Sequence, residues 1–284
     1  MYVSAKVPAS CGELAQGFLL GEPFLITCPV DIYAEAIVSD EFVGRENLGW
    51  KAAKALELWL AESGRENFPF GVRLRSNIPQ GKGMASSSAD IAAVLAAAGA
   101  ALGENIAPDE IARIAAQVEP TDGVFFPGLV RINYMSGEVK ANLGVPPKMN
   151  LIIFDSGGTV DTLDFHEKAA EITEDKTELG SAVELFASLD AAKIGEGATI
   201  SARLNQSRLP KPRLEELIDF VTARGALGVT VAHSGTVIGV LLPADLAEEL
   251  LPAHAANIGW RFPELRFLAT AHLIPGGIEL EVRP

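Results

Sequence analysis

Residues 77–90, NIPQGKGMASSSAD, run directly into an alanine-rich segment, IAAVLAAAGAAL, and this junction constrains the fold more than any other part of the chain. The alanines predict a helix, because alanine is the strongest helix former. Gly81 and Gly83 allow positive φ angles and a close approach of the backbone to a ligand. The serines at 86–88 favour the N-cap position. We therefore expect a tight loop that ends at a capped helix.

This loop predicts an anion site. The first N–H groups of a helix lack intrahelical partners and carry partial positive charge, which suits a phosphate. Lys82 could add a point charge, and a serine hydroxyl could reach a phosphate or a bound Mg²⁺. The spacing fits neither the Walker A loop, since no Ser or Thr follows Lys82, nor the dinucleotide pattern, which needs glycine at position 86. A plain capped turn between a strand and a helix is the alternative.

Composition limits the partners. The 284 residues are 48% hydrophobic and 21% charged, as in ordinary globular proteins of one large or two small domains. The formal net charge is −14 and no basic stripe is visible, so we expect neither nucleic acid nor a membrane surface as a partner. A small anionic ligand remains compatible with this charge. The oligomeric state is left open by the sequence.

No targeting segment is apparent. The start, MYVSAKVPASCGEL, lacks an apolar core behind a basic region, and the longest apolar run is shorter than the ~20 residues of a membrane span. The two cysteines make neither a disulfide framework nor a zinc site. We expect reduced, mostly buried thiols and a cytoplasmic protein.

The pattern of strands and helices predicts an α+β fold in two parts, with the division placed at residues 1–146 and 147–284. The first part should form a mixed sheet with helices. Its expected strands are 1–8, 24–38 and 70–76, its helices 47–62, 86–102 and 108–119, and a hairpin turns at Ser136-Gly137. The second part has the order β-α-β-β-α-β of a ferredoxin-like layer. Its expected strands include 150–155, 227–233 and 236–243, with helical sequence between 156 and 224 and a helix over 244–257.

Three stretches resemble the motifs of the GHMP kinases, a family that includes galactokinase, homoserine kinase, mevalonate kinase and phosphomevalonate kinase. PQGKGMASSSAD resembles the central motif P-x-G-x-G-[LM]-[GA]-S-S. KVPASCGELAQGF, residues 6–18, and GVTVAHSGTVIGVLLP, residues 228–243, resemble the N-terminal and C-terminal motifs in the same order. The resemblance implies the two-part GHMP fold and phosphoryl transfer to an alcohol, with ATP and Mg²⁺ as cofactors.

Within this family, three further features narrow the resemblance. P-A-S-C-G-E-L-x-Q-G, E-P-T-D at 119–122 and D-S-G-G-T-V-D-T at 155–162 are similar to the L-threonine kinases of cobamide assembly. This implies L-threonine as the small-molecule substrate. Three alternatives stay open: a homoserine kinase, a kinase for another acceptor, and a ligand sensor of the same fold without catalysis.

The resemblance also implies site residues. Asp122 would act on the acceptor hydroxyl as a base or as an orienting group, although it could simply form a turn with Gly123. Ser10 stands where other members carry a lysine that pairs with the base. Mg²⁺ would be held by Glu119 with Ser87 or Ser86. The ATP phosphates would be cradled by Pro79, Gln80, Gly81, Lys82, Gly83, Met84, Ala85, Ser86, Ser87 and Ser88.

An amino-acid substrate needs groups that bind its ammonium and its carboxylate. Glu13 and Asp31 are candidates for the ammonium, although Asp31 could equally be a carboxylate in solvent. The other substrate candidates are polar residues of the N-terminal and C-terminal motifs, namely Ser10, Cys11, Gln16, His233 and Ser234.

Overall fold

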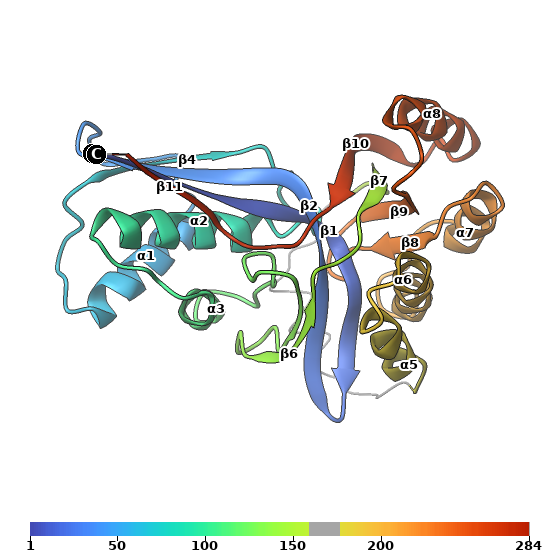
Figure 1. Cartoon of the computed structure of the whole chain (residues 1–284), viewed down its shortest axis with the longest axis horizontal. Helices are drawn as coiled ribbons and strands as arrows, with labels where there is room; N and C mark the ends of the chain where they lie inside the picture. Colours follow the sequence, from blue (N-terminus) through green and yellow to red (C-terminus); the bar gives the residue numbers. More distant parts are fainter. Residues whose placement is uncertain (159–176, 284) are drawn as a thin grey trace.

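A computed structural model describes residues 1–158 and 177–283 of the chain. Two long antiparallel strands, β1 (Tyr2–Leu19) and β2 (Glu22–Ser39), run through the middle of the molecule and bend where its two lobes meet (Figure 1). One lobe carries the first three helices and the other carries the helices from α5 onward. The bend of these two strands therefore positions everything else.

The bend in β1 has a local cause. Its pairing with β2 is irregular between Pro8 and Ala15, and within this stretch Gly12 has a φ of +64°. A Cβ at Gly12 would lie 2.5 Å from the backbone of Val231, so no larger residue fits. The strand expected at residues 1–8 thus continues to Leu19. Local alternation could not show this, because pairing with β2 maintains the strand beyond the break.

The first lobe matches the expected order of elements. Strand β4 (Gly71–Ser76) pairs with β2, and the short β3 (Arg45–Glu46) runs parallel to β4. The helices are α1 (Trp50–Glu62), α2 (Ser86–Ala101) and α3 (Pro108–Ala116). Eleven residues of α2 are buried, because its alanines let it pack closely between the sheet and the other two helices. The hairpin of β5 (Leu129–Ile132) and β6 (Val139–Gly144) turns at Ser136-Gly137 as expected.

The second lobe has the predicted ferredoxin-like arrangement. Its strands are β7 (Met149–Asp155), β8 (Gly228–Val231), β9 (Val237–Pro243) and β10 (Arg266–Leu273), which lie antiparallel in the order β8-β9-β7-β10. The helices are α5 (Thr177–Phe186), α6 (Ala191–Asn205), α7 (Leu214–Thr222) and α8 (Leu251–Arg261). The helix expected at 244–257 begins later, after a 3₁₀ turn (Glu248–Leu250), because Pro252 favours the first turn of α8.

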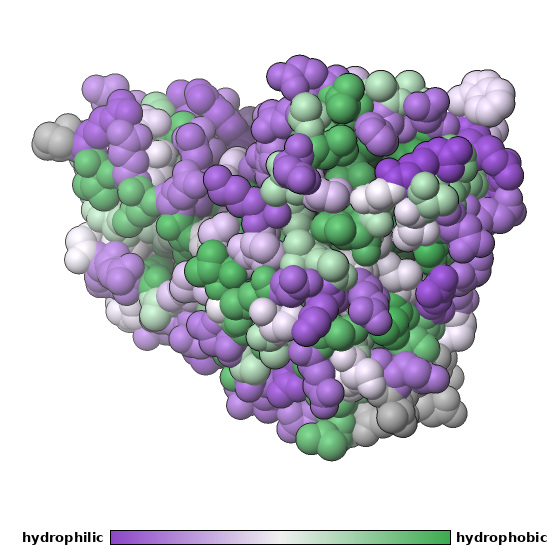
Figure 2. Space-filling view, turned by 45° about the vertical axis from the view of Figure 1, so that its right-hand side comes forward, coloured by the Kyte–Doolittle hydropathy of each residue, from purple (hydrophilic) through white to green (hydrophobic). Residues whose placement is uncertain are grey.

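The sheet is continuous between the lobes. Strand β11 (Glu279–Arg283) pairs with β1, and the end of β10 pairs with β2. Because one sheet runs through both lobes, the predicted domain boundary between residues 1–146 and 147–284 stays a prediction. On the face in Figure 2, apolar residues lie in small groups between polar ones. No helix in residues 1–158 and 177–283 is both long and apolar enough to cross a bilayer.

Candidate active site

The three motif segments meet where the lobes join. The carbonyl oxygen of Lys82 accepts hydrogen bonds from the backbone N–H groups of Thr236 (2.9 Å) and Val237 (3.1 Å). The backbone N–H of Ser10 donates to the carbonyl of Met84 at 3.0 Å. The glycine-rich loop is thereby fixed to strand β1 on one side and to the turn between β8 and β9 on the other.

Small residues make this junction possible. Gly83 has a φ of +79°, and a Cβ there would lie 2.3 Å from the Cβ of Ala232. A Cβ at Gly235 would lie 2.3 Å from the carbonyl oxygen of Lys82. Both glycines are therefore needed for the loop and the turn to touch.

The start of helix α2 differs from the prediction. Ala85 occupies the N-cap position with a φ of 56°, and no side chain caps the helix. The serines at 86–88 belong to its first turn, so the expectation that a serine caps α2 was wrong. The physical reason is that the loop enters through a left-handed residue, which places the serines inside the helix. The first N–H groups of α2 thus keep no side-chain partner and can bind an anion.

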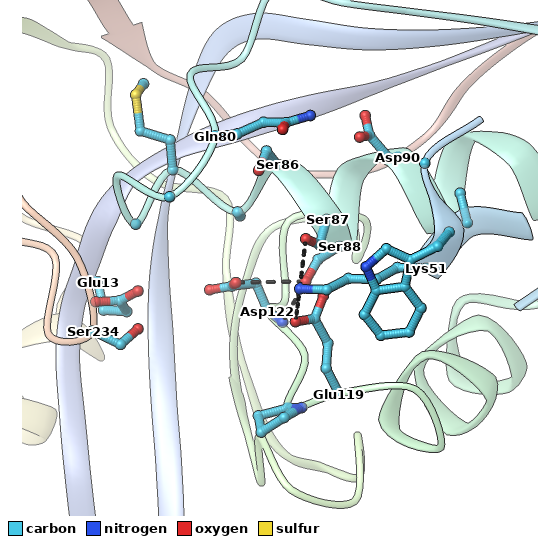
Figure 3. A pocket seen from close by; sticks show the side chains of 18 residues that line it. Glu13, Lys51, Gln80, Ser86, Ser87, Ser88, Asp90, Glu119, Asp122 and Ser234 are labelled. Carbon is cyan, nitrogen blue, oxygen red and sulfur yellow. Dashed lines mark hydrogen bonds and ion pairs between the residues drawn. The ribbon is translucent and has the colours of Figure 1, made fainter. Parts of the chain in front are cut away.

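A cavity of about 330 Å³ opens in front of this helix start (Figure 3). It collects side chains from β1, α1, α2, the segment after α3 and the turn between β8 and β9. Its polar and loop wall is formed by Glu13, Lys51, Gln80, Gly81, Gly83, Met84, Ala85, Ser86, Ser87, Ser88, Asp90, Glu119, Asp122 and Ser234.

Lys51 is the cation of this cavity, and sequence reasoning missed it. Its ammonium lies 2.5 Å from Oε2 of Glu119 and 3.3 Å from Oγ of Ser87 (Figure 3). The lysine lies in the first turn of α1, and nothing in the local pattern distinguishes it from Lys54 on the same helix. Only the packing of α1 beside α2 brings its ammonium next to Ser87 and Glu119.

The surroundings of Glu119 fit a divalent cation. Glu119 is buried, and its Oε1 has no hydrogen-bond partner in the part of the chain that the structure describes. The ammonium of Lys51 lies between Glu119 and Ser87, the two groups expected to hold Mg²⁺, so this position already suits a positive charge. The residues that the structure describes contain no cluster of three His, Cys, Asp or Glu side chains that could hold a metal. Mg²⁺ usually takes one or two carboxylates from the protein and completes its shell with phosphate oxygens and water.

Asp122 is held in place by Ser88. The Oγ of Ser88 accepts from the backbone N–H of Asp122 at 3.0 Å and lies 3.5 Å from its Oδ2. Oδ1 of Asp122 is buried and has no hydrogen-bond partner within residues 1–158 and 177–283. Burial raises the pKa of Asp122 well above its ordinary value, and the charges of Glu13 and Glu119 raise it further. The geometry is that of a carboxylate suited to take up a proton, held in place by Ser88.

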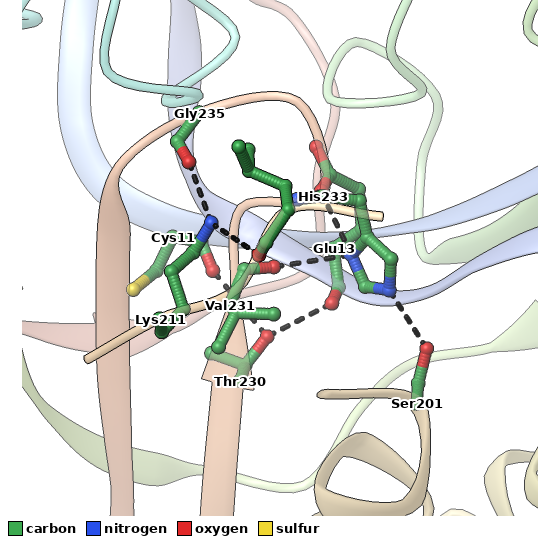
Figure 4. A network of polar contacts seen from close by, with 9 residues as sticks. Cys11, Glu13, Ser201, Lys211, Thr230, Val231, His233 and Gly235 are labelled. Carbon is green, nitrogen blue, oxygen red and sulfur yellow. Dashed lines mark hydrogen bonds and ion pairs between the residues drawn. The ribbon is translucent and has the colours of Figure 1, made fainter. Parts of the chain in front are cut away.

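A buried polar network lies behind Glu13 (Figure 4). Oε2 of Glu13 accepts from the backbone N–H of His233 at 2.7 Å and lies 3.2 Å from its Nδ1. The other ring nitrogen of His233 is 2.9 Å from Oγ of Ser201 on α6. The ammonium of Lys211 donates to the carbonyl of Gly235 at 2.7 Å. This network fixes Glu13 at the cavity wall and holds the turn that touches the glycine-rich loop.

Two of the residues expected at the phosphates do not line the cavity, namely Pro79 and Lys82. The ammonium of Lys82 forms an ion pair of 2.9 Å with Oδ2 of Asp155 at the end of β7. Lys82 therefore does not contribute to the cavity wall in this structure, and its contact with phosphate stays a prediction. Lys51, by contrast, lines the cavity.

Several expected substrate residues also lie elsewhere. Ser10 and Cys11 lie in strand β1 and are fully buried, and burial raises the pKa of the Cys11 thiol. Gln16 lies further along β1, beyond this cavity. Asp31 accepts from the backbone N–H of His272 and lies 2.7 Å from its Nδ1. His233 supports Glu13 from behind.

Of the expected substrate residues, therefore, only Glu13 and Ser234 line the cavity. Residues 159–162 of the D-S-G-G-T-V-D-T motif lie outside the described residues.

Comparison with known proteins shows to which family a chain with this site belongs. Residues 47–126 match the N-terminal domain of the GHMP kinases, and residues 182–257 match the GHMP kinase C-terminal region. The L-threonine kinase of Citrobacter freundii is 31% identical over 98% of this chain and 99% of that protein. The chain belongs to the GHMP kinase family. The L-threonine kinase of Salmonella typhimurium is also 31% identical, over 98% of this chain and 95% of that protein.

Solved structures confirm the GHMP kinase fold. The mevalonate kinase of Methanococcus jannaschii superposes with a TM-score of 0.68 at 16% identity, covering 96% of this chain and 97% of that one. A structure of MDDEF in complex with MVAPP, AMPPCP and magnesium gives a TM-score of 0.62 at 18% identity, covering 99% of each chain. The predicted family, two-part fold and small-molecule kinase class are thus confirmed.

Proposed function

We propose that this GHMP kinase phosphorylates the side-chain hydroxyl of L-threonine, using ATP and producing O-phospho-L-threonine and ADP. The observation that carries the proposal is the identity of 31% to two curated L-threonine kinases over nearly the whole chain. The cavity supports it, since it offers a phosphate site, a base and a carboxylate for an ammonium. In this proposal the reaction occurs in the cytoplasm and supplies the aminopropanol linker of cobamides.

The nucleotide phosphates would lie at the start of α2. The uncapped N–H groups of its first turn, together with Gly81, Gly83 and Ser86, provide donors for phosphate oxygens. Lys51 is close enough to Ser87 to add a positive charge on the same side. Phosphoryl transfer depends mainly on such positioning and charge neutralisation.

Glu119 and Ser87 are the residues that would hold Mg²⁺. Bound there, the ion would neutralise charge on the transferred phosphoryl group. The unpartnered Oε1 of Glu119 and the nearby Ser87 hydroxyl suit a hard cation that prefers oxygen ligands. Among proteins of this fold, the MDDEF structure contains magnesium and AMPPCP together.

Asp122 would act on the acceptor. As the threonine oxygen forms its bond to the γ-phosphorus and the bond to the β–γ bridging oxygen breaks, Oδ1 of Asp122 accepts the hydroxyl proton. The raised pKa of Asp122 favours its protonated product form. A positioned base of this kind contributes about 10²–10⁴-fold in rate.

Glu13 would bind the substrate ammonium. It lies across the cavity from Asp122, beside Ser234 (Figure 3). His233 holds one oxygen of the Glu13 carboxylate, which fixes the direction of the group. A fixed carboxylate across the cavity from the base would favour an amino-acid alcohol over mevalonate or a sugar, which carry no ammonium.

The test is an ATP-consumption assay with L-threonine, L-homoserine, L-serine, mevalonate and galactose, in which ³¹P NMR identifies the product. We expect the highest kcat/KM with L-threonine and a phosphomonoester on its hydroxyl oxygen. A higher kcat/KM with L-homoserine would assign the protein to the alternative kinase. Binding of ATP without turnover of any acceptor would indicate the non-catalytic sensor.

A further inference from the structure

Asp90 is a carboxylate of the cavity that the proposed reaction does not use. It lies one helical turn beyond Ser86 on α2, on the same face of the helix, as positions i and i+4 do. Its Oδ1 is buried and has no hydrogen-bond partner among the described residues. No cation among the residues that the structure describes pairs with it, and burial raises its pKa to about 6 against the opposing effect of a hydrogen bond from Ser76.

Two cavities meet at Asp90. The cavity in front of the start of α2 adjoins a larger hollow of about 900 Å³, which is bordered by strand β4 and the loop after it. Gly49, Gln80 and Asp90 line both spaces. In Figure 3, Gln80 and Asp90 stand on the side of α2 away from Glu119. A ligand whose phosphates lie at the start of α2 and whose remainder extends into the hollow must pass Asp90.

The chemistry of a nucleotide decides which of its groups can bind there. An ionised carboxylate needs hydrogen-bond donors, and the phosphates have none. One helical turn spans about 5.4 Å, so the ligand group beside Asp90 lies only a few bonds beyond the phosphates. The ribose hydroxyls fit this distance, whereas the exocyclic amine of the base is at the far end of the molecule. An acidic side chain also binds a ribose hydroxyl in the unrelated dinucleotide-binding fold.

We propose that Asp90 accepts hydrogen bonds from the ribose hydroxyls of the nucleotide and thereby selects ribonucleotides over deoxyribonucleotides. The inference rests on the proposed function only in requiring a nucleoside triphosphate as phosphoryl donor. It does not depend on the identity of the acceptor.

Binding of ADP, 2′-deoxy-ADP and 3′-deoxy-ADP, measured by calorimetry at pH 7.5, tests the proposal without any phosphoryl transfer. The wild type should bind ADP about tenfold or more tightly than at least one deoxy analogue, since hydrogen bonds to charged groups are the stronger ones. In Asp90→Ala this preference should fall to about twofold or less. Asp109→Asn, at an exposed carboxylate on α3, should keep the wild-type preference.

Two controls separate a contact from a structural role. Asp90→Asn keeps the shape and one acceptor oxygen, so it should show an intermediate preference and an unfolding midpoint no lower than that of the wild type. It also replaces Asp90→Ala if the smaller side chain disturbs α2. A wild type without any preference, or an Asp90→Ala protein with the wild-type preference, would refute the inference.

The result is distinguishable from a failure of the proposed function. If threonine is not phosphorylated while Asp90→Ala loses the ribose preference, the acceptor assignment fails and the inference stands. If threonine is phosphorylated while both proteins discriminate equally, the inference alone fails.

Discussion

The cavity and the network behind it differ in how completely their polar atoms are paired. In the cavity, one carboxylate oxygen each of Asp90, Glu119 and Asp122 is buried without a partner. These are three of the six such side-chain atoms among the described residues. In the network, by contrast, both ring nitrogens of His233 and the ammonium of Lys211 have partners.

This difference indicates that the cavity binds ligands, whereas the network stabilises the fold around it. An unpaired buried polar atom costs about 1–3 kcal/mol, so a protein that keeps several in one cavity gains from them only when a ligand supplies the partners. A fully paired network instead fixes the side chains it contains. Glu13 belongs to both regions, since its carboxylate lines the cavity while His233 holds one of its oxygens. Substitutions in the cavity should therefore affect function without loss of stability, and substitutions in the network should affect stability.

The largest effect is expected at Asp122. Asp122→Asn removes the proton acceptor and keeps the shape, so kcat should fall by about 10²–10⁴-fold while the affinity for ADP stays within about twofold. Because burial opposes the charge of Asp122, the amide should leave the unfolding midpoint unchanged or higher. Steady-state kinetics, calorimetry with ADP and thermal unfolding measure the three quantities.

Asp219→Asn, at an exposed carboxylate on α7, is the matched control for charge. A kcat within tenfold of the wild type would show that Asp122 only orients the hydroxyl. A lower unfolding midpoint with unchanged kcat would show that Asp122 stabilises the fold, and would contradict the distinction between a functional cavity and a stabilising network.

The sequence predicted much of the cavity side. The central motif, Glu119 and Asp122 carry residue types and spacings that the family resemblance makes recognisable. Glu119, Asp122 and most of the motif, though not Pro79 and Lys82, line the cavity together. The helix that follows the loop was also predictable, since a run of alanines is a local signal. Its alanine N-cap was not, because the left-handed conformation of Ala85 depends on how the loop packs against β1 and the β8–β9 turn.

Partners distant in the chain were not predictable. Lys82 stands in a sequence pattern typical of phosphate binding but pairs with Asp155, 73 positions later. Lys51 pairs with Glu119, although its local sequence does not differ from that of other lysines in helices. The network depends on Ser201 and Lys211, which carry no motif at all. A single sequence contains local preferences, whereas these contacts follow from how segments distant in the chain pack together, within each lobe and between the two.

An intermediate effect is expected at Lys211, in the paired network. Burial lowers the pKa of Lys211 to about 8 from an unfolded value near 10.5. The unfolded chain therefore binds more protons between these two values, and the unfolding free energy of the wild type should rise across this range of pH. Relative to Lys211→Met, the rise should be about 2–3 kcal/mol.

Chemical denaturation at pH 7.5, 9 and 10.5 measures this difference. Lys193→Met, at an exposed lysine on α6, should show no comparable dependence on pH. Lys211→Met should also bind ATP more weakly, because Lys211 holds Gly235 against the glycine-rich loop. A constant difference between wild type and Lys211→Met over this range would remove Lys211 from the network as a buried cation.

The smallest effect is expected at Lys51, on the cavity side. Lys51→Met removes one positive charge beside the phosphates, so KM for ATP should rise about tenfold, with a smaller change in kcat than in Asp122→Asn. The rise should shrink at high salt, because part of the attraction is screened. Lys54→Met on the same helix is the control, since Lys54 is exposed to solvent. Equal KM values for the two variants would mean that the backbone of α2 alone binds the phosphates, and that Lys51 only neutralises the buried Glu119.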